Sequence, residues 1–190
     1  MPARKIPFDR ITTRGGDEGF STLYNGERRS KDDLVFQVLG DLDELNSFLG
    51  WVKAEEPGFP FRDEVESLQS NLFRIGAEVA TPTSDPRFHS LDNLTDQDVR
   101  ILEILEKKVL DSIALPDRFV LPGGCPLSAR LDICRTVCRR AERSLVALIR
   151  SRGLRELATC QRYLNRMSDY LYILARRADQ QWMNQKGEQE

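Results

Sequence analysis

Apolar side chains recur at alternating steps of three and four residues along most of this chain, which is the spacing of one face of an α-helix. The pattern predicts five long helices: one from Val35 to just before Pro57, one over 65–79, one from an N-cap at Thr95 to Leu115, one starting at Pro126, and one over 154–184. These apolar faces, or seams, repeat about every 3.5 residues, so we expect the helices to pack against each other at shallow angles with a left-handed twist. The predicted fold is all-α, a five-helix up-and-down bundle.

Residues 1–33 lack helical periodicity and are rich in glycine, threonine, serine and charge. We predict an irregular glycine-rich loop or a flexible arm here, and no convincing strand pairing is visible anywhere in the chain. A strand-like apolar piece covers 119–124 and ends in a tight turn, and Cys125 is a poor N-cap for the helix after it. We expect a single domain over 1–190, made of the N-terminal loop at 1–33 and the helical bundle at 34–186.

The charge balance gives no general reason to expect a polyanionic partner. The chain holds 28 Lys and Arg against 30 Asp and Glu, for a net charge of −2. Nucleic acid and membrane surfaces are therefore not expected as partners, and any anion site must be local. No apolar run approaches the roughly 20 residues that span a bilayer, and the N-terminus lacks an apolar signal core. We expect a soluble cytoplasmic protein, or a mitochondrial matrix protein if this is a eukaryotic mature form.

All four cysteines lie in the C-terminal half (Cys125, Cys134, Cys138 and Cys160), and three of them fall on or beside apolar stripe positions. They are predicted to be reduced core residues. Cys134 and Cys138 are one turn apart, but no second pair of ligands completes a structural zinc site, so we expect no protein metal site. The only histidine, His89, falls in a loop with proline and aspartate, where we expect it to be exposed.

A row of arginines is the first candidate for chemistry. Four fall within the nine residues 135–143 of the predicted fourth helix. Arg135 and Arg139 are one turn apart and Glu142 lies three residues further on, so the three project along one flank. Such a row can hold a polyanion. The alternative is a solvated face on which the arginines pair with Asp132 and Glu142.

The glycine-rich segment 13–19 is a second candidate anion site. Gly15, Gly16 and Gly19 allow backbone N–H groups to converge on an anion, and Lys31 follows with further positive charge. The segment is neither a Walker A motif nor a dinucleotide fingerprint. A flexible surface turn therefore remains the alternative.

On the first predicted helix, Asp43 and Asn46 lie one turn apart beside the apolar seam. A carboxylate at the core edge needs a cationic partner, because an unpaired buried charge is costly. Arg135 on the fourth helix can supply it. Phe48 and Trp51 lie beside the same seam, and the sequence leaves open whether they belong to the core or to a subunit interface.

Three blocks occur in order between residues 11 and 178: 13–19 with 26–33, then 40–47, then 119–124 through 135–143 to 163–169. Each block alone is modest, whereas the ordered set is specific. Together they resemble the ATP:cob(I)alamin adenosyltransferases of the propanediol-utilisation type. The resemblance implies a five-helix bundle that forms a homotrimer with active sites between subunits. It also implies transfer of the 5′-deoxyadenosyl group of ATP to cob(I)alamin with release of triphosphate, Mg²⁺ entering with ATP, and a cobalamin-dependent acceptor enzyme as a further partner.

The resemblance assigns the nucleotide to two groups of residues. The N-terminal loop would wrap the triphosphate of ATP with Thr13, Arg14, Gly16, Asp17, Gly19 and Lys31. Arg139 and Glu142 would act at the phosphates and at Mg²⁺, and Asn165 would address the nucleoside.

The resemblance assigns the corrinoid to three residues. Asp43 and Arg135 would form an ion pair across the subunit interface beside the corrin, and Phe119 would cover the lower face of cobalt. Because Co(I) is itself the nucleophile, no protein base is needed, which agrees with the scarcity of histidine. A phenylalanine that keeps water and the lower ligand off cobalt would favour reduction to Co(I).

Several positions depart from the family pattern. The family commonly has Tyr-Thr-Lys-Thr-Gly-Asp at 12–17, where this chain has Thr-Thr-Arg-Gly-Gly-Asp, and it commonly has serine at Cys125 and histidine at Asp132. Arg14 keeps the charge of lysine but changes its geometry, and Gly15 removes a hydroxyl group. These departures put the affinity for ATP in question, but they leave Arg139, the chief phosphate candidate, in place.

Two alternatives belong to other functional classes. A corrinoid escort would bind the cofactor and pass it on without adenosylating it, and anaerobic turnover with reduced cobalamin and MgATP separates it from the enzyme. A basic helical nucleic-acid-binding bundle would need the arginine row to face outward and gains nothing from the net charge of −2.

Overall fold

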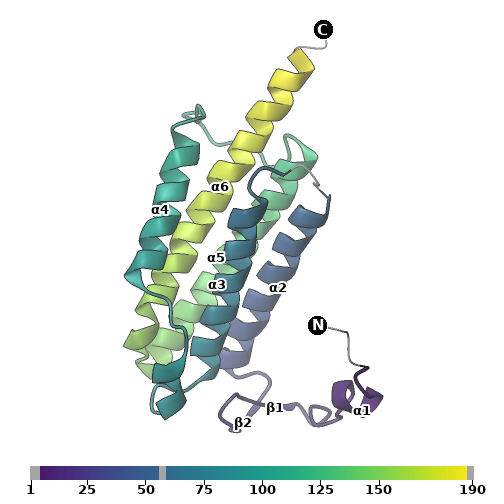
Figure 1. Ribbon diagram of the computed structural model, residues 1–190, viewed down its shortest axis with the longest axis vertical. Helices are drawn as coiled ribbons and strands as arrows, with labels where there is room; N and C mark the ends of the chain where they lie inside the picture. The colour runs from purple at the N-terminus through teal and green to yellow at the C-terminus, as the bar shows by residue number, and fades with distance from the viewer. Residues whose placement is uncertain (1–4, 56–58, 188–190) are drawn as a thin grey trace.

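The computed structural model describes residues 5–55 and 59–187. Five long helices run side by side along its long axis (Figure 1), which confirms the predicted bundle. They are α2 (Leu34–Glu55), α3 (Arg62–Ala80), α4 (Asp96–Leu110), α5 (Pro126–Arg152) and α6 (Ala158–Gly187). Helix α5 packs against α2 and α6, while α4 packs on α6 and α3 on α2. The last turns of α6 project beyond the other helices.

The predicted seam residues form the core. Leu45, Leu49, Leu145 and Leu164 are completely buried. All four cysteines are free and buried, as predicted, and burial raises the pKa of the Cys134 thiol to about 12. At neutral pH the Cys134 thiol therefore remains protonated and acts as a small apolar residue. None of the helices in the described part of the chain is both long and apolar enough to cross a membrane.

Helix ends follow the sequence signals in some places and not in others. Thr95 caps α4 as predicted, in a capping box with Asp98. Helix α4 nevertheless ends at Leu110 rather than Leu115, and the strand expected at 119–124 is irregular chain. The two 3-10 helices η1 (Pro86–Ser90) and η2 (Arg155–Leu157) lie in connections, so the last long helix starts later than predicted. His89, in η1, is exposed as expected.

The cap of α5 corrects the expectation for Cys125. The Ser128 backbone N–H donates to the Cys125 sulfur at 3.4 Å, and the Cys125 N–H donates to the Ser128 hydroxyl at 3.0 Å. A thiol is a weak acceptor, but the reciprocal bond to Ser128 completes a capping box. Sequence alone underrated Cys125 because the hydroxyl that compensates lies three residues away.

The N-terminal segment contains regular structure that its sequence does not predict. It holds a short helix, α1 (Phe8–Ile11), and an antiparallel hairpin of β1 (Phe20–Thr22) and β2 (Arg28–Ser30) with Phe20 opposite Ser30. The expectation that no strands pair was wrong, because three-residue strands are too short to show an alternating pattern. The turn places Gly26 at φ +88°, a conformation that favours glycine.

Two ion pairs tie this hairpin to the bundle. Arg152, at the end of α5, donates to both carboxylate oxygens of Asp33 at 2.6 and 2.7 Å. Arg29 on β2 lies 3.6 Å from the same carboxylate. Leu23, in the hairpin turn, is buried against the core. The hairpin is therefore held at the end of the bundle where α5 finishes.

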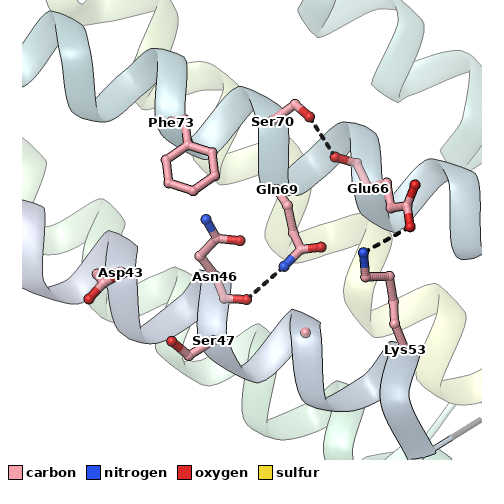
Figure 2. Close-up of a pocket in the computed structure, with 9 residues that line it drawn as sticks. Asp43, Asn46, Ser47, Lys53, Glu66, Gln69, Ser70 and Phe73 are labelled. Atoms are coloured by element: carbon pink, nitrogen blue, oxygen red, sulfur yellow. Dashed lines mark hydrogen bonds and ion pairs between the residues drawn. The ribbon is translucent and has the colours of Figure 1, made fainter. Parts of the chain in front are cut away.

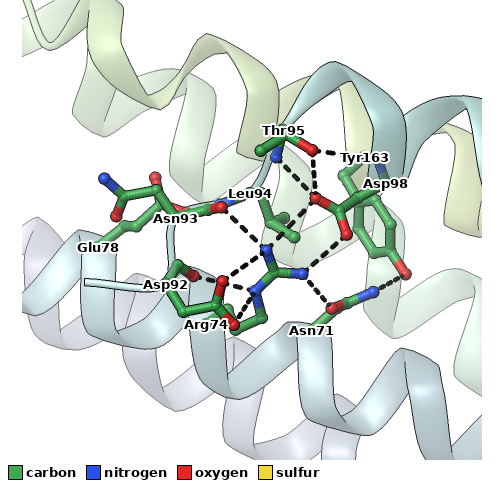
Figure 3. A network of polar contacts seen from close by, with 9 residues as sticks. All are labelled: Asn71, Arg74, Glu78, Asp92, Asn93, Leu94, Thr95, Asp98 and Tyr163. Carbon is green, nitrogen blue, oxygen red and sulfur yellow. Dashed lines mark hydrogen bonds and ion pairs between the residues drawn. The ribbon is translucent and has the colours of Figure 1, made fainter. Parts of the chain in front are cut away.

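Arg74 links α3 to the start of α4 (Figure 3). Its Nη1 donates to Asp98 Oδ1 at 2.8 Å and to Asn71 Oδ1 at 2.8 Å, and its Nη2 donates to the carbonyl oxygen of Asn93 at 2.9 Å. Asn71 in turn donates to the hydroxyl of Tyr163 on α6 at 2.8 Å. One guanidinium therefore joins three elements, which compensates the cost of placing it near the core.

Candidate active site

The middle of α5 presents an unpaired arginine beside a polar pair. Arg139 is exposed, and its guanidinium makes no hydrogen bond or ion pair with any residue that the structure describes. Asn165 on α6 donates from Nδ2 to Oε1 of Glu142 at 3.2 Å. Of the neighbouring arginines, Arg140 pairs instead with Asp41 on α2, with Nε 3.0 Å from Oδ1. The solvated-face alternative is therefore observed in part: Arg135 pairs with Asp132, whereas Glu142 accepts from Asn165 and pairs with no arginine among the described residues.

Arg135 and Asp43 are not paired within the chain, in contrast to the expectation. Arg135 Nε donates to Oδ1 of Asp132, one turn earlier on α5, at 3.0 Å. Asp43 is exposed on α2, so water solvates its carboxylate and no partner within the chain is needed. The pairing of Asp43 with Arg135 was wrong for a single subunit, because the sequence does not show which side of α2 faces α5.

Asp43 instead lines an open groove between α2 and α3 (Figure 2). The groove has a volume of about 550 Å³ and also contacts Asn46 and Phe73. Phe73 is 70% exposed, and Asn46 Oδ1 is buried with no hydrogen-bond partner in the described part of the chain. An exposed phenylalanine and an unsatisfied amide oxygen are both features that a second molecule would cover.

The glycine-rich loop is an ordered turn that closes on Lys31. The backbone N–H of Lys31 donates to the carbonyl oxygen of Gly19 at 2.8 Å, and Gly19 itself has φ +80°. The Thr13 hydroxyl accepts from the Gly15 N–H at 3.4 Å. A Cβ atom on Gly16 would lie only 2.8 Å from Lys31 Nζ, so the lysine side chain lies directly over this glycine. The segment is thus a surface turn whose hydrogen bonds bring Lys31 over Gly16.

Arg14 and Asp17 occupy the tip of the same turn. Arg14 has φ +57°, the left-handed conformation that non-glycine residues rarely adopt. The Asp17 N–H donates to the Arg14 carbonyl oxygen at 3.2 Å and both side chains are exposed. A strained backbone of this kind is often found at ligand-binding sites, which agrees with the expected role of the loop.

Phe119 is completely exposed, at 106% of its reference area, in the connection between α4 and α5. Leu121 in the same connection is 88% exposed. Phe119 is therefore not part of the core of the subunit. Burial of two such side chains requires another molecule, because water is a poor environment for both.

The sequence model of one protein family, cobalamin adenosyltransferase, matches residues 11–178. This span includes the glycine-rich loop, Asp43, Phe119 and the α5–α6 polar pair. The chain belongs to the cobalamin adenosyltransferase family.

Relatives of this cobalamin adenosyltransferase include the corrinoid adenosyltransferase MMAB of Bos taurus, which is 42% identical over 93% of this chain and 74% of its own length. The corrinoid adenosyltransferase of Bacillus subtilis (strain 168) is 39% identical over 88% of this chain and 85% of its own length. The recognition of the family from the ordered blocks is confirmed.

Solved structures with the same fold include a PduO-type ATP:corrinoid adenosyltransferase from Lactobacillus reuteri. A phenylalanine-to-alanine variant of that enzyme, complexed with cobalamin and ATP, matches with a TM-score of 0.82 at 32% identity, over 89% of this chain and 93% of that chain. An arginine-to-lysine variant complexed with ATP matches with a TM-score of 0.80 at 33% identity over the same shares.

One polar residue of this adenosyltransferase escapes sequence reasoning. Arg166 donates from Nη1 to Asn165 Oδ1 at 2.6 Å and pairs through Nε with Glu103 on α4 at 3.0 Å. It therefore fixes which side of the Asn165 amide faces Glu142. The block 163–169 contains it, but only the tertiary contact with α4 shows that it orients Asn165.

Proposed function

We propose that this protein transfers the 5′-deoxyadenosyl group of ATP to cob(I)alamin at sites formed between the subunits of a homotrimer. The observation that carries the proposal is the unpaired Arg139 guanidinium beside the Glu142–Asn165 pair. A cation without a partner, next to an oriented amide and a carboxylate, suits the phosphates and the sugar of a nucleotide. The family and the ATP-bound relatives support the same assignment.

The reaction is a displacement at carbon. The cobalt of cob(I)alamin supplies the electron pair that forms the Co–C5′ bond, the C5′–O bond breaks, and its electrons leave with triphosphate. The protein provides no base and contributes alignment of cobalt with C5′. Arg139, together with Lys31 of the loop, neutralises the charge of the departing triphosphate, which is the kind of electrostatic stabilisation that lowers such a barrier.

The proposed sites combine residues of two subunits. The hairpin beside the glycine-rich loop is tied to Arg152 at the end of α5, whereas Arg139 lies about 20 Å away along the same helix at about 1.5 Å per residue. A neighbouring subunit can bring its own loop to Arg139. The exposed Phe119, Phe73 and Asp43 side chains support a protein surface that is completed by a second copy.

At the corrinoid, Asp43 of one subunit meets Arg135 of the next in this proposal. The Nη1 and Nη2 atoms of Arg135 make no hydrogen bond with any described residue, so they are available to the Asp43 carboxylate of a neighbouring subunit. Phe119 covers the lower face of cobalt, where an apolar side chain excludes water and a fifth ligand. Loss of those ligands favours the reduced state, because Co(I) binds fewer ligands than Co(II).

Magnesium fits this site as an ion that arrives with ATP. Mg²⁺ commonly keeps several waters and takes one or two carboxylates together with substrate phosphates. Glu142 offers one carboxylate beside Arg139, and the described residues contain no group of three or more acidic, histidine or cysteine side chains that could hold a metal. When bound, the ion would add positive charge at the triphosphate.

Subunit mixing tests the proposed site directly. A Lys31→Ala subunit and an Arg139→Ala subunit are each expected to be inactive as homotrimers. If the loop of one subunit serves Arg139 of the next, unfolding and refolding the two together restores activity, because some mixed interfaces carry both intact residues. Anaerobic loss of the Co(I) spectrum with MgATP is the readout. Failure of an equimolar mixture to recover any activity, with mixed trimers verified by mass spectrometry, would place the whole site within one subunit.

A further inference from the structure

Four charged side chains form a line that starts at Arg135 on α5, passes through the core and ends at Asp179 on α6. Arg135 Nε donates to Asp132 Oδ1 at 3.0 Å, and Arg176 Nη2 donates to Asp132 Oδ2 at 2.6 Å. Arg176 Nη2 also lies 3.1 Å from Asp179 Oδ2. Two positive and two negative groups alternate along the line, so their charges balance.

The inner members of this line cannot turn away from one another. The side chains of Asp132 and Arg176 are only 5% and 4% exposed. A buried charge that loses its partner is strongly destabilising, so both oxygens of the Asp132 carboxylate stay engaged. Oδ1 therefore holds the guanidinium of Arg135 through Nε, and neither Nη atom donates a hydrogen bond to a described residue.

Asp179, the last member of the line, contacts the α4–α5 connection, which also carries Phe119. A Cβ atom on Gly124 would lie 2.3 Å from Asp179 Oδ1, so this carboxylate rests against the glycine backbone. Gly124 directly precedes Cys125, the N-cap of α5. The same buried line thus contacts the base of the α4–α5 connection and the arginine on α5.

We propose that Asp132 is a positioning residue for the corrinoid, which acts by fixing the guanidinium of Arg135. Because Asp132 holds Nε, the Nη1 and Nη2 atoms of Arg135 keep one fixed orientation toward the subunit interface and the corrinoid. Arg176 holds the Asp132 carboxylate in place in the core through its bond to Oδ2. The inference rests on the role of Arg135 in the proposed function, and it adds a residue that touches neither substrate.

Asp132→Asn removes the negative charge and keeps the size of the side chain. The expected result is a rise of about tenfold in the KM for cob(I)alamin, the scale of one lost hydrogen bond to a charged group. The KM for ATP and kcat at saturating corrinoid stay within about twofold. Asp98→Asn is the matched control, since Asp98 is also a partly buried, arginine-paired carboxylate. It should lower stability and leave both KM values unchanged.

The variant Asp132→Glu covers the case in which Asp132→Asn does not fold. It retains the charge but displaces the carboxylate by one bond, so the trimer should fold while the KM for cob(I)alamin still rises. An unchanged corrinoid KM in the folded Glu variant overturns the proposal. So does a loss of kcat with both KM values unchanged, which is what a purely structural role predicts.

A double-mutant cycle with Arg135→Ala separates this proposal from the proposed function. If Asp132 acts through Arg135, Asp132→Asn adds nothing to the corrinoid KM once Arg135 is removed. Additive effects overturn the positioning role. If Arg135→Ala leaves the corrinoid KM unchanged, the assignment of Arg135 fails and the positioning role fails with it. If Arg135→Ala raises that KM and neither Asp132 variant does, only the positioning role fails.

Discussion

Asn165 on α6 donates a hydrogen bond to Glu142 on α5, with Nδ2 and Oε1 3.2 Å apart. The other end of the same amide accepts from Arg166 at 2.6 Å, so its orientation is fixed from both sides. Arg139, one turn before Glu142, has no partner among the described residues. The pair is therefore oriented by contacts within the chain, and the cation beside it is available to a ligand.

Arg139→Ala is expected to reduce kcat by about 10²–10³-fold, the effect of removing one preorganised donor from a developing anion. An exposed, unpaired arginine contributes little to folding, so the Tm should hardly change. Anaerobic turnover and thermal unfolding measure the two effects. Arg150→Ala, another exposed arginine of α5, is the control and should behave as wild type. Near-normal turnover by the Arg139 variant would refute the phosphate assignment.

Gly16→Ala and Gly15→Ala form a matched pair in the glycine-rich loop. A Cβ atom on Gly16 would lie 2.8 Å from Lys31 Nζ and must push that side chain aside, whereas a Cβ on Gly15 meets nothing closer than 3.7 Å. We expect Gly16→Ala to raise the KM for ATP by about tenfold, the scale of one displaced charged contact, and Gly15→Ala to leave it unchanged. Initial rates at varied ATP concentration measure both KM values. Equal KM values for the two variants would show that Lys31 does not contribute to ATP binding.

Phe119→Ala should leave the stability of the subunit unchanged, because the side chain is fully exposed and leaves no cavity behind. The KM for ATP should also be normal. We expect loss of the four-coordinate Co(II) signal in spectra of the enzyme with Co(II) corrinoid and MgATP, with partial rescue of turnover by pre-reduced Co(I).

Leu121→Ala is the control for Phe119, as an equally exposed apolar residue of the same connection. It should retain the four-coordinate signal. If both variants show the wild-type spectrum, Phe119 does not shield cobalt.

Asp43→Asn is expected to raise the KM for cob(I)alamin by about tenfold while the KM for ATP stays within about twofold. The reason is loss of the proposed pair with Arg135 of the neighbouring subunit. A double-mutant cycle with Arg135→Gln measures the coupling. Fully additive effects on the corrinoid KM would show that the two residues do not meet in the proposed trimer.

The pH dependence of stability should report the Arg74–Asp98 pair. Burial raises the pKa of the Asp98 carboxyl, but hydrogen bonds from Arg74 and Thr95 outweigh it, and the net pKa lies below the ordinary value of 3.8. A lowered pKa stabilises the fold above the unfolded-state value and loses that effect as the pH falls through the folded-state value.

Asp98→Asn should therefore cost about 1–3 kcal/mol at pH 7 and progressively less below about pH 4. Urea unfolding of both proteins at pH 7, 4 and 3 measures this difference. A difference in unfolding free energy that does not change with pH would show that the charge of Asp98 is not what stabilises the link between α3 and α4.

Local patterns in the sequence determine the bundle. The three-four spacing predicted each long helix, and Thr95 and Pro126 marked the starts of two of them, because helix caps and seams depend on residues a few positions apart. The sequence does not predict the hairpin, because its three-residue strands are too short to show an alternating pattern. The hairpin is held in place by the pair of Asp33 with Arg152, which are far apart in the sequence. The family, and with it the candidate residues, follows from ordered motifs that the sequence displays directly.

Which charged groups meet is decided only by the tertiary structure. Within one subunit the fold pairs Arg135 with Asp132 and leaves Asp43 exposed to solvent, and the pair of Asp43 with Arg135 across subunits stays a prediction. Helical periodicity fixes the angle of a side chain about its own helix and says nothing of how neighbouring helices are rotated against each other. That rotation, set by packing of the whole core, leaves Arg139 without a partner among the described residues, while Phe119 lies exposed in the irregular connection before α5.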